Sequence, residues 1–309
     1  MTVPSAIPTD TKGRVLVIGA TGFIGRYVAE ASLSAGRPTY ILVRPGAAPP
    51  SKAAIVKAFQ DKGAIPIHGV INDKPLMEKI LREHEIDIVI SAVGGSSILD
   101  QLVLVEAMKS VKTVKRFLPS EFGHDVDRAD PVEPGLAMYQ EKRMIYGDGS
   151  VKAYFVHGTD IGKFTMMAVD DIRTVKKNVH FRPPANCYSI NDLASMWEKK
   201  IGRTLPRVTI SEDDLLAAAA ANCIPQSIVA SFTHDIFIKG CQVNFYDGAG
   251  DVEVTALYPS ETFRSLEDCF EDFVVMIKDE DKEDKIERGK KGLPNPKPVV
   301  EALPVTAMC

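Results

Sequence analysis

Short apolar runs alternate with longer amphipathic stretches from residue 14 onward. Such runs are typical of strands buried on both faces of a parallel sheet, and the stretches between them have the spacing of helices. We expect strands at residues 14–18, 38–43, 64–68, 86–92 and 116–119. We expect helices at residues 25–35, 52–62, 74–83 and 97–110. The repeated strand–helix order predicts an α/β fold with a doubly wound parallel sheet.

The second half of the chain shows a weaker pattern that indicates a smaller α/β region, suited to binding a substrate. Strands are expected at 153–156, 178–182 and 207–210, and helices at 191–201 and 213–221. The predicted organisation is a flexible N-terminus at 1–13, a nucleotide-binding domain at 14–150, an interleaved region at 151–277 and a charged flexible tail at 278–309. Residues 278–291 mix both charge signs, which favours a solvated helix that frays, with a partner-binding tail as the alternative.

Composition narrows the class of protein and its partners. The 309 residues are 45% hydrophobic and 25% charged, which excludes a fully disordered chain. The formal net charge of −4 gives no general attraction to nucleic acid or to an anionic membrane, so a small molecule is the expected partner. The five cysteines form no C-x-x-C pair, which argues against a zinc cluster, and we expect no metal. Residues 1–13 contain no apolar signal-peptide core, so a cytoplasmic location is expected.

A glycine-rich turn directly follows the first expected strand and opens the first expected helix. It has the spacing G-x-x-G-x-x-G and consists of Gly19, Ala20, Thr21, Gly22, Phe23, Ile24 and Gly25. Gly19 would allow the tight turn, Gly22 would let the backbone approach a pyrophosphate, and Gly25 would let the helix pack on the strand. This order predicts a Rossmann-type dinucleotide site with phosphates at the helix N-terminus. A tight turn without a ligand is the alternative.

The end of the second strand distinguishes NADP from NAD. Arg44 ends this strand and Lys52 follows at the start of the next helix, and no acidic residue occurs from 38 to 59. A cation here favours the 2′-phosphate of NADP, whereas a carboxylate would bind the 2′-hydroxyl of NAD. The sequence therefore predicts NADPH as the cofactor. The alternatives are that Arg44 is simply solvated at a strand end and that Lys52 is an ordinary cation on a helix surface.

Candidate reactive residues follow the fifth strand. His124 lies shortly after that strand. Tyr139 and Lys142 lie three residues apart on an expected helix, so they would share one face. A lysine partly desolvated beside the cofactor crevice can act as a base, and a histidine can donate or relay a proton. The small residues of segment 91–97 would allow the cofactor to approach closely, although a flexible loop explains them nearly as well.

These motifs resemble the plant isoflavone-reductase-like family, the NADPH-dependent, NmrA-type reductases of phenylpropanoid metabolism within the atypical short-chain dehydrogenases. The motifs that carry the resemblance are 19–25, 42–44, 117–123 and 141–143. Within the family, segments 122–131, 178–183, 197–203 and 230–245 are most similar to the branch that reduces leucoanthocyanidins. The resemblance extends from about residue 14 to 275, which is far more specific than a glycine motif alone.

The resemblance implies reduction of a flavan-3,4-diol at C4 to a flavan-3-ol such as catechin, through a quinone methide. Lys142 would be the base that ionises the ring phenol, His124 would assist departure of the C4 hydroxyl, and Tyr139 and His124 would contact the substrate. Tyr139 lies three residues before Lys142 rather than four, which argues against the Tyr-x-x-x-Lys chemistry of alcohol–ketone exchange. The alternatives are isoflavone, pinoresinol or phenylcoumaran ether reduction, or NADPH binding without turnover.

The chain departs from the family pattern just after the lysine. Residues 142–145 run directly into 146–149, which resemble the turn beyond the next strand and loop of the family. One βα unit of roughly 30 residues is therefore expected to be missing here. Either the protein carries a true deletion and is destabilised and poorly active, or the sequence omits a segment of the natural protein.

Overall fold

The structure, a computed structural model, describes residues 12–94, 97–123, 150–202, 204, 210–221, 223, 226–243 and 248–272. These residues belong to two compact units. The first comprises the chain up to Phe122 together with Ile161–Ile172, and the second comprises Gly123–Asp160 and the chain from Arg173 onward. The expected flexible N-terminus up to residue 11 and the expected charged tail lie outside the described residues.

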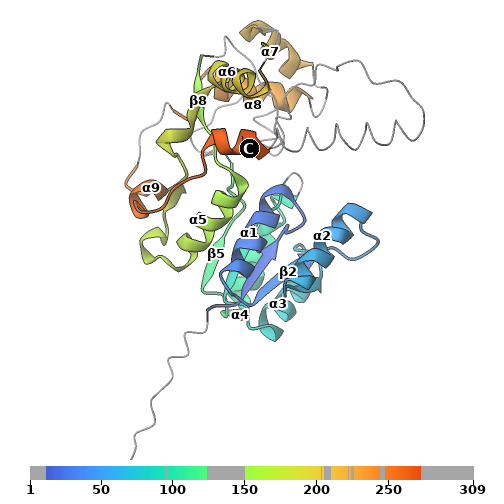
Figure 1. The fold of residues 1–309 in the computed structure, drawn as a ribbon. Coiled ribbons are helices and arrows are strands. Elements are labelled where there is room, and N and C mark those ends of the chain that lie inside the picture. Colours follow the sequence, from blue (N-terminus) through green and yellow to red (C-terminus); the bar gives the residue numbers. More distant parts are fainter. Residues whose placement is uncertain are drawn as a thin grey trace, which may run out of the picture. The chain divides into compact units, whose positions relative to one another are not determined.

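The first unit is built on a parallel sheet, as predicted (Figure 1). Its strands are β1 (Val15–Ile18), β2 (Thr39–Val43), β3 (Ile65–His68), β4 (Ile88–Ser91) and β5 (Arg116–Leu118). They lie in the order β3-β2-β1-β4-β5, and every neighbouring pair is parallel. All five expected strands are confirmed, and the chain reverses its direction of progress across the sheet between β1 and β4. This reversal is the feature that makes a doubly wound sheet open a crevice at its carboxyl edge.

Helices cover both faces of this sheet. They are α1 (Phe23–Ser34), α2 (Pro50–Asp61), α3 (Lys74–Glu83), α4 (Gln101–Val111) and α5 (Gly158–Asp170). Alternate residues of β1 point to opposite faces: Val15 and Val17 join a core with α1, α2 and α5, whereas Leu16 and Ile18 join a core with α3 and α4. The strands are therefore buried on both sides, which explains why their sequences read as continuous apolar runs.

Helix α5 was not among the predicted helices, yet it completes the first core. It lies beside α1, and Gly162 approaches so closely that a methyl group there would overlap the carbonyl oxygen of Tyr27 (Figure 1). The Arg116 guanidinium donates to the Ala168 carbonyl oxygen at 3.3 Å, which fastens α5 to β5. Its sequence begins with glycine and contains β-branched and aromatic residues, so intrinsic propensity gave little sign of a helix.

The described part of the second unit contains two small sheets and several helices. Strand β6 (Lys152–Tyr154) pairs antiparallel with β8 (Cys187–Ser189), and β7 (Asn178–His180) pairs parallel with β9 (Asp251–Glu253). Its helices include α6 (Ile190–Ile201), α7 (Glu212–Ala220), α8 (Gln226–Phe237) and α9 (Val254–Leu257), and residues 266–272 are helical as well. Its 3₁₀ turns are Ile172–Thr174 and Pro184–Asn186. Of the expected strand at 207–210, residues 207–209 lie outside the described residues.

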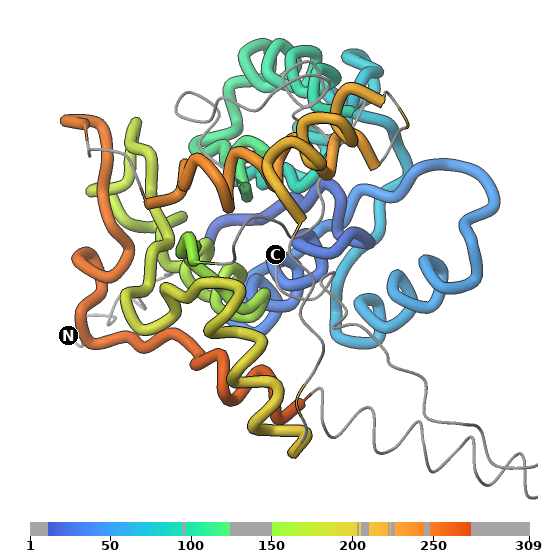
Figure 2. Tube along the Cα trace, turned by 90° about the horizontal axis from the view of Figure 1, so that it is seen from above, coloured from blue at the N-terminus to red at the C-terminus, as the bar shows by residue number. Residues whose placement is uncertain are grey.

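Two serines determine where the predicted helices of this unit begin. Ser189 and Ser211 each accept the backbone N–H three residues later and form capping boxes with Asp192 and Asp214. Helix α7 packs beside α8 (Figure 2). Helix α8 was not predicted because several of its buried residues are polar, including His234. These polar residues interrupt the apolar stripe from which an amphipathic helix is predicted.

No helix in the described ranges is long and apolar enough to span a bilayer.

Candidate dinucleotide-binding site

The glycine turn lies at the carboxyl ends of β1 and β4, where the strand order reverses. Ala92 follows β4 and donates its backbone N–H to the carbonyl oxygen of Ile18, the last residue of β1, at 2.8 Å. Open α/β sheets bind their ligands in the crevice outside this point of reversal. The turn predicted from the sequence is thus placed where such a fold binds a dinucleotide.

Two of the glycines in the turn cannot be replaced without moving the backbone. Gly19 has φ of +84°, and a Cβ there would overlap the carbonyl oxygen of Ala92. A Cβ on Gly25 would overlap the carbonyl oxygen of Gly19, so the helix packs tightly against the start of its own turn. Gly22 is less restricted, because a Cβ there would lie 3.1 Å from the Gly19 oxygen, and its N–H donates to that oxygen at 2.8 Å. The turn is therefore compact, and α1 packs directly against its start.

The N-terminus of α1 is suited to an anion. Gly22 is its N-cap, no side chain caps it, and no acidic residue lies in its first turn. Exposed amide groups and the positive end of the helix dipole then remain available to phosphate oxygens. Arg26 adds a cation next to this turn, with its guanidinium carbon 4.9 Å from the ring centroids of both Phe23 and Tyr27. Arg26 was not predicted from the sequence. The aromatic residues Phe23 and Tyr27 on either side of it could have indicated that cation–π contacts fix its guanidinium.

Arg44 and Lys52, the cations expected to bind the 2′-phosphate, are both exposed beyond the end of β2. In the part of the chain that the structure describes, no ion pair or side-chain hydrogen bond holds either of them. Lys52 lies in the first turn of α2, behind the N-cap Pro49. Two unpaired cations that follow the strand next to β1 are available to a phosphate.

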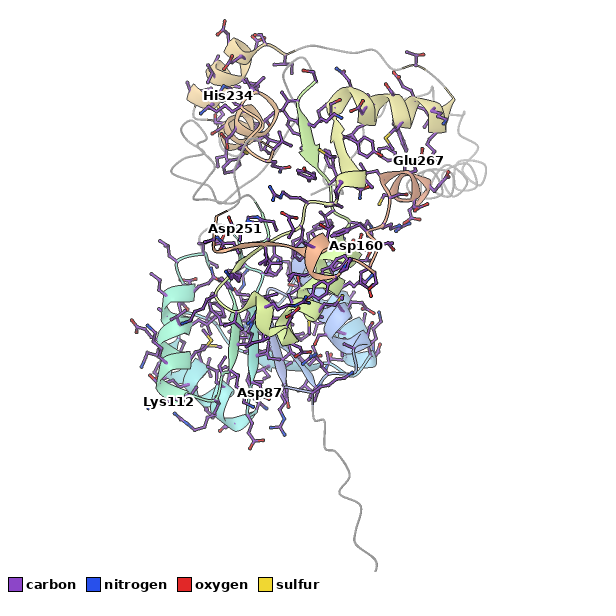
Figure 3. All side chains as sticks on the ribbon, turned by 90° about the vertical axis from the view of Figure 1, so that its left-hand side faces the viewer. Asp87, Lys112, Asp160, His234, Asp251 and Glu267 are labelled. Atoms are coloured by element: carbon purple, nitrogen blue, oxygen red, sulfur yellow. The ribbon has the colours of Figure 1, made fainter. Side chains whose placement is uncertain are left out.

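Several charged groups at the opposite, amino end of the sheet pair with one another. Asp87 lies there, at the same end as Lys112 (Figure 3). It accepts from the Lys115 ammonium at 2.6 Å and from the Arg14 backbone N–H at 3.0 Å. Burial would raise the pKa of Asp87, but these hydrogen bonds outweigh it and hold the pKa below its usual value. This cluster stabilises the fold rather than offering a site.

The reactive residues expected from the sequence, His124, Tyr139 and Lys142, lie outside the described residues. Their roles therefore stay predictions, as does the shortened helix expected to carry the lysine. The structure does describe the chain that leads up to them. Strand β5 ends at Leu118, and the chain is described as far as residue 123. Within the described ranges, no group of three or more histidine, cysteine, aspartate or glutamate side chains could hold a metal ion.

The chain matches the model of the NmrA-like family in two segments, residues 11–148 and 146–270. The two matches meet at 146–148, next to the position where the sequence departs from its expected pattern.

Individual relatives match over most of their length. A leucoanthocyanidin reductase from Desmodium uncinatum is 59% identical, with 97% of this chain and 90% of the relative covered. That alignment is 347 residues long, more than the 309 residues of this chain, so it includes positions for which this chain has no residue. A phenylcoumaran benzylic ether reductase from Ginkgo biloba is 39% identical over 85% of this chain and 99% of the relative. Among solved structures, the binary complex of leucoanthocyanidin reductase with NADPH from Vitis vinifera is 62% identical, with a TM-score of 0.81, 85% of this chain and 100% of that chain covered.

Proposed function

This chain belongs to the NmrA-like family, and we propose that it is an NADPH-dependent oxidoreductase that reduces leucoanthocyanidins at C4 to flavan-3-ols such as catechin. The observation that carries the proposal is its identity to leucoanthocyanidin reductases, one of them solved with NADPH. The phenylcoumaran benzylic ether reductase from Ginkgo biloba is clearly less similar, at 39% against 59%. Reduction of an isoflavone, pinoresinol or phenylcoumaran ether is accordingly the second choice.

The described residues fit an NADPH molecule. The compact turn of Gly19, Ala20, Thr21, Gly22, Phe23, Ile24 and Gly25 would hold the pyrophosphate at the N-terminus of α1, where no side chain occupies the amide groups. Arg44 and Lys52 would bind the 2′-phosphate. When bound, NADPH supplies the hydride for the reduction. The chain's own contribution at this site is to fix the cofactor's position against the crevice.

The proton chemistry is assigned to residues beyond the fifth strand. Lys142 takes the proton of the ring phenol, which lets the ring electrons expel the C4 hydroxyl and form a quinone methide. His124 gives a proton to the departing hydroxyl, which leaves as water, and Tyr139 contacts the flavonoid. A benzylic hydroxyl is a poor leaving group, so this pair of proton transfers is what makes C4 reactive.

Turnover of leucocyanidin tests the proposal. The purified chain is incubated with leucocyanidin and NADPH, and flavan-3-ol is quantified by chromatography beside NADPH oxidation. Catechin formed in equal amount to NADPH consumed supports the proposal. Reduction of an isoflavone or a phenylcoumaran ether without any catechin would assign the chain to the sibling activity instead.

The chain also lacks, we propose, about one βα unit after residue 145. The division of the family match at 146–148 and an alignment longer than the chain support this proposal. A chain without this unit would lose a wall of the crevice, so NADPH binding without turnover is a specific alternative. NADPH binding with no product from any flavonoid would identify this alternative. The intact mass of the natural protein decides whether the segment is truly absent. A mass of 33.7 kDa would match the present chain, and a larger mass would show that the natural protein contains the segment.

The remaining assignments extend the same proposal. The nucleotide-binding domain would span 14–150, and the interleaved region 151–277 would contact the flavonoid. The net charge of −4 supports a small-molecule partner rather than nucleic acid. We place the protein in the cytoplasm, which fractionation of cells that express it would test.

A further inference from the structure

Ser120 and Gln101 join the ends of two neighbouring strands at the carboxyl edge of the sheet. The Ser120 hydroxyl donates to the carbonyl oxygen of Val93, beyond β4, at 2.5 Å. The Ser120 backbone N–H donates to Oε1 of Gln101 at 3.0 Å, and Nε2 of Gln101 donates to the carbonyl oxygen of Ile98 at 3.1 Å. These three hydrogen bonds, which we call the clip, connect the loop after β4, the start of α4 and the loop after β5.

The loop after β4 is in turn fixed against the glycine turn. Ala92, which precedes Val93, donates its N–H to the carbonyl oxygen of Ile18. The Ala92 carbonyl oxygen lies so close to Gly19 that it would overlap a Cβ there. Contacts therefore run without interruption from the glycine turn through Ala92 and Val93 to Ser120. The position of Ser120 relative to the turn is set by short hydrogen bonds rather than by loop length.

The chain beyond Ser120 is held a second time. The Phe122 side chain packs partly buried against the core that contains α1 and α5, and the Glu121 N–H donates to the Pro119 carbonyl oxygen at 2.9 Å. Ser120 and Phe122, the residues on either side of Glu121, are therefore both held in place. Together they set the direction in which the chain leaves β5. His124 follows two residues after Phe122 in the sequence.

We propose that Ser120 and Gln101 are positioning residues, which hold the segment leading to His124 at a set distance from the dinucleotide-binding turn. The inference rests on the proposed function, because it concerns the proton that His124 gives to the leaving hydroxyl. Catalytic groups must be placed within a fraction of an ångström, and a misplacement of about 1 Å can cost roughly a hundredfold in rate. The clip therefore affects turnover and leaves cofactor affinity unchanged, since the glycine turn has its own hydrogen bonds.

Paired substitutions test the clip. Ser120→Ala removes the bond to Val93, and Gln101→Leu removes the acceptor for the Ser120 N–H with little change in side-chain volume. We expect each to lower kcat by about tenfold to a hundredfold, with the NADPH dissociation constant and the melting temperature within error of the starting protein. Ser120→Thr, which keeps the hydroxyl, and Gln101→Glu, which keeps the acceptor for Ser120, restore most of the turnover.

The matched control is Ser110→Ala. Ser110 also donates its hydroxyl to a backbone carbonyl, that of Glu106, but on the exposed side of α4. It should leave kcat unchanged. The positioning role is overturned if Ser120→Ala lowers kcat no more than Ser110→Ala does, or if kcat, NADPH affinity and melting temperature fall together, which indicates a purely structural role.

The starting protein, assayed in parallel, separates the two proposals. If it forms no flavan-3-ol, the proposed function fails and the positioning role fails with it. If it forms flavan-3-ol and the clip variants turn over equally fast, only the positioning role fails.

Discussion

Gly25 lies so close to Gly19 that a methyl group on Gly25 would overlap the carbonyl oxygen of Gly19. The contact joins the first turn of α1 to the residue that leaves β1, six positions earlier in the chain. The oxygen of Gly19 also accepts the Gly22 N–H, so it cannot move aside without breaking a hydrogen bond of the turn. The shape of the phosphate-binding turn therefore depends on the absence of a side chain at position 25.

Gly25→Ala should abolish high-affinity NADPH binding. The added Cβ forces α1 away from the turn and changes the direction of the amide groups that would bind phosphate. We expect the NADPH dissociation constant, measured by the fluorescence of bound NADPH, to rise at least tenfold. Gly250→Ala is the control, because a Cβ at Gly250 meets no atom within 4 Å. Equal NADPH affinity in the two variants would contradict the proposed site.

Arg44→Ala should remove the preference for NADPH over NADH. A charge-assisted hydrogen bond contributes about 1.5–3 kcal/mol, so NADPH affinity should fall roughly tenfold to a hundredfold while NADH affinity stays constant. Titrations with both cofactors measure this ratio. Lys79→Ala on α3 removes another exposed cation, one that lies 3.9 Å from Glu83, and should leave the ratio unchanged. A ratio insensitive to Arg44 would exclude its assigned contact.

The sequence predicted the sheet well because a parallel strand buried on both faces can be recognised from its own continuous apolar run. β1 and β4 are buried along their whole length, and both were expected within two residues of their bounds. The start of α4 was expected at residue 97, but the helix begins at Gln101 because a turn precedes it and the Gln101 amide bonds back to Ile98. Such a side-chain bond leaves no periodic signal in the sequence.

Other features depend on contacts between distant residues and could not be predicted. The clip joins Ser120 to Val93, 27 residues earlier, and α5 reaches the first core only by returning from beyond residue 150. The candidate turn was recognised because its glycines are local in sequence. Arg26 was not, since its place beside Phe23 and Tyr27 follows from side-chain packing.

Lys142→Ala should stop flavan-3-ol formation without loss of cofactor binding. Without a base, the ring phenol is not ionised and the C4 hydroxyl does not leave, so kcat should fall about a hundredfold or more, the usual scale of general acid–base catalysis. Product assay and NADPH titration on the same preparation give both quantities. Lys199→Ala, on the exposed side of α6, is the control. Undiminished turnover in Lys142→Ala would remove the lysine from the mechanism.

His157 should make the protein less stable in mild acid. Its Nδ1 accepts the Thr159 N–H at 3.3 Å at the start of α5 and lies 2.7 Å from the Thr159 hydroxyl, an arrangement that requires an unprotonated Nδ1. Burial, and then the positive charge of Arg264, lower the pKa of His157 in the folded protein. The unfolded chain therefore binds the proton more readily, and the free energy of unfolding falls as the pH drops below the unfolded value of about 6.5.

His157→Asn isolates this contribution, because asparagine can still accept the Thr159 N–H at the helix start but does not titrate. Urea unfolding at a series of pH values from 8 to 5 measures the free energy of unfolding. The slope of stability against pH should decrease in His157→Asn by an amount that corresponds to less than one proton. The slope can decrease only if the unfolded chain binds more protons than the folded protein. An unchanged slope in His157→Asn would mean that the partly buried imidazole does not take up its proton on unfolding.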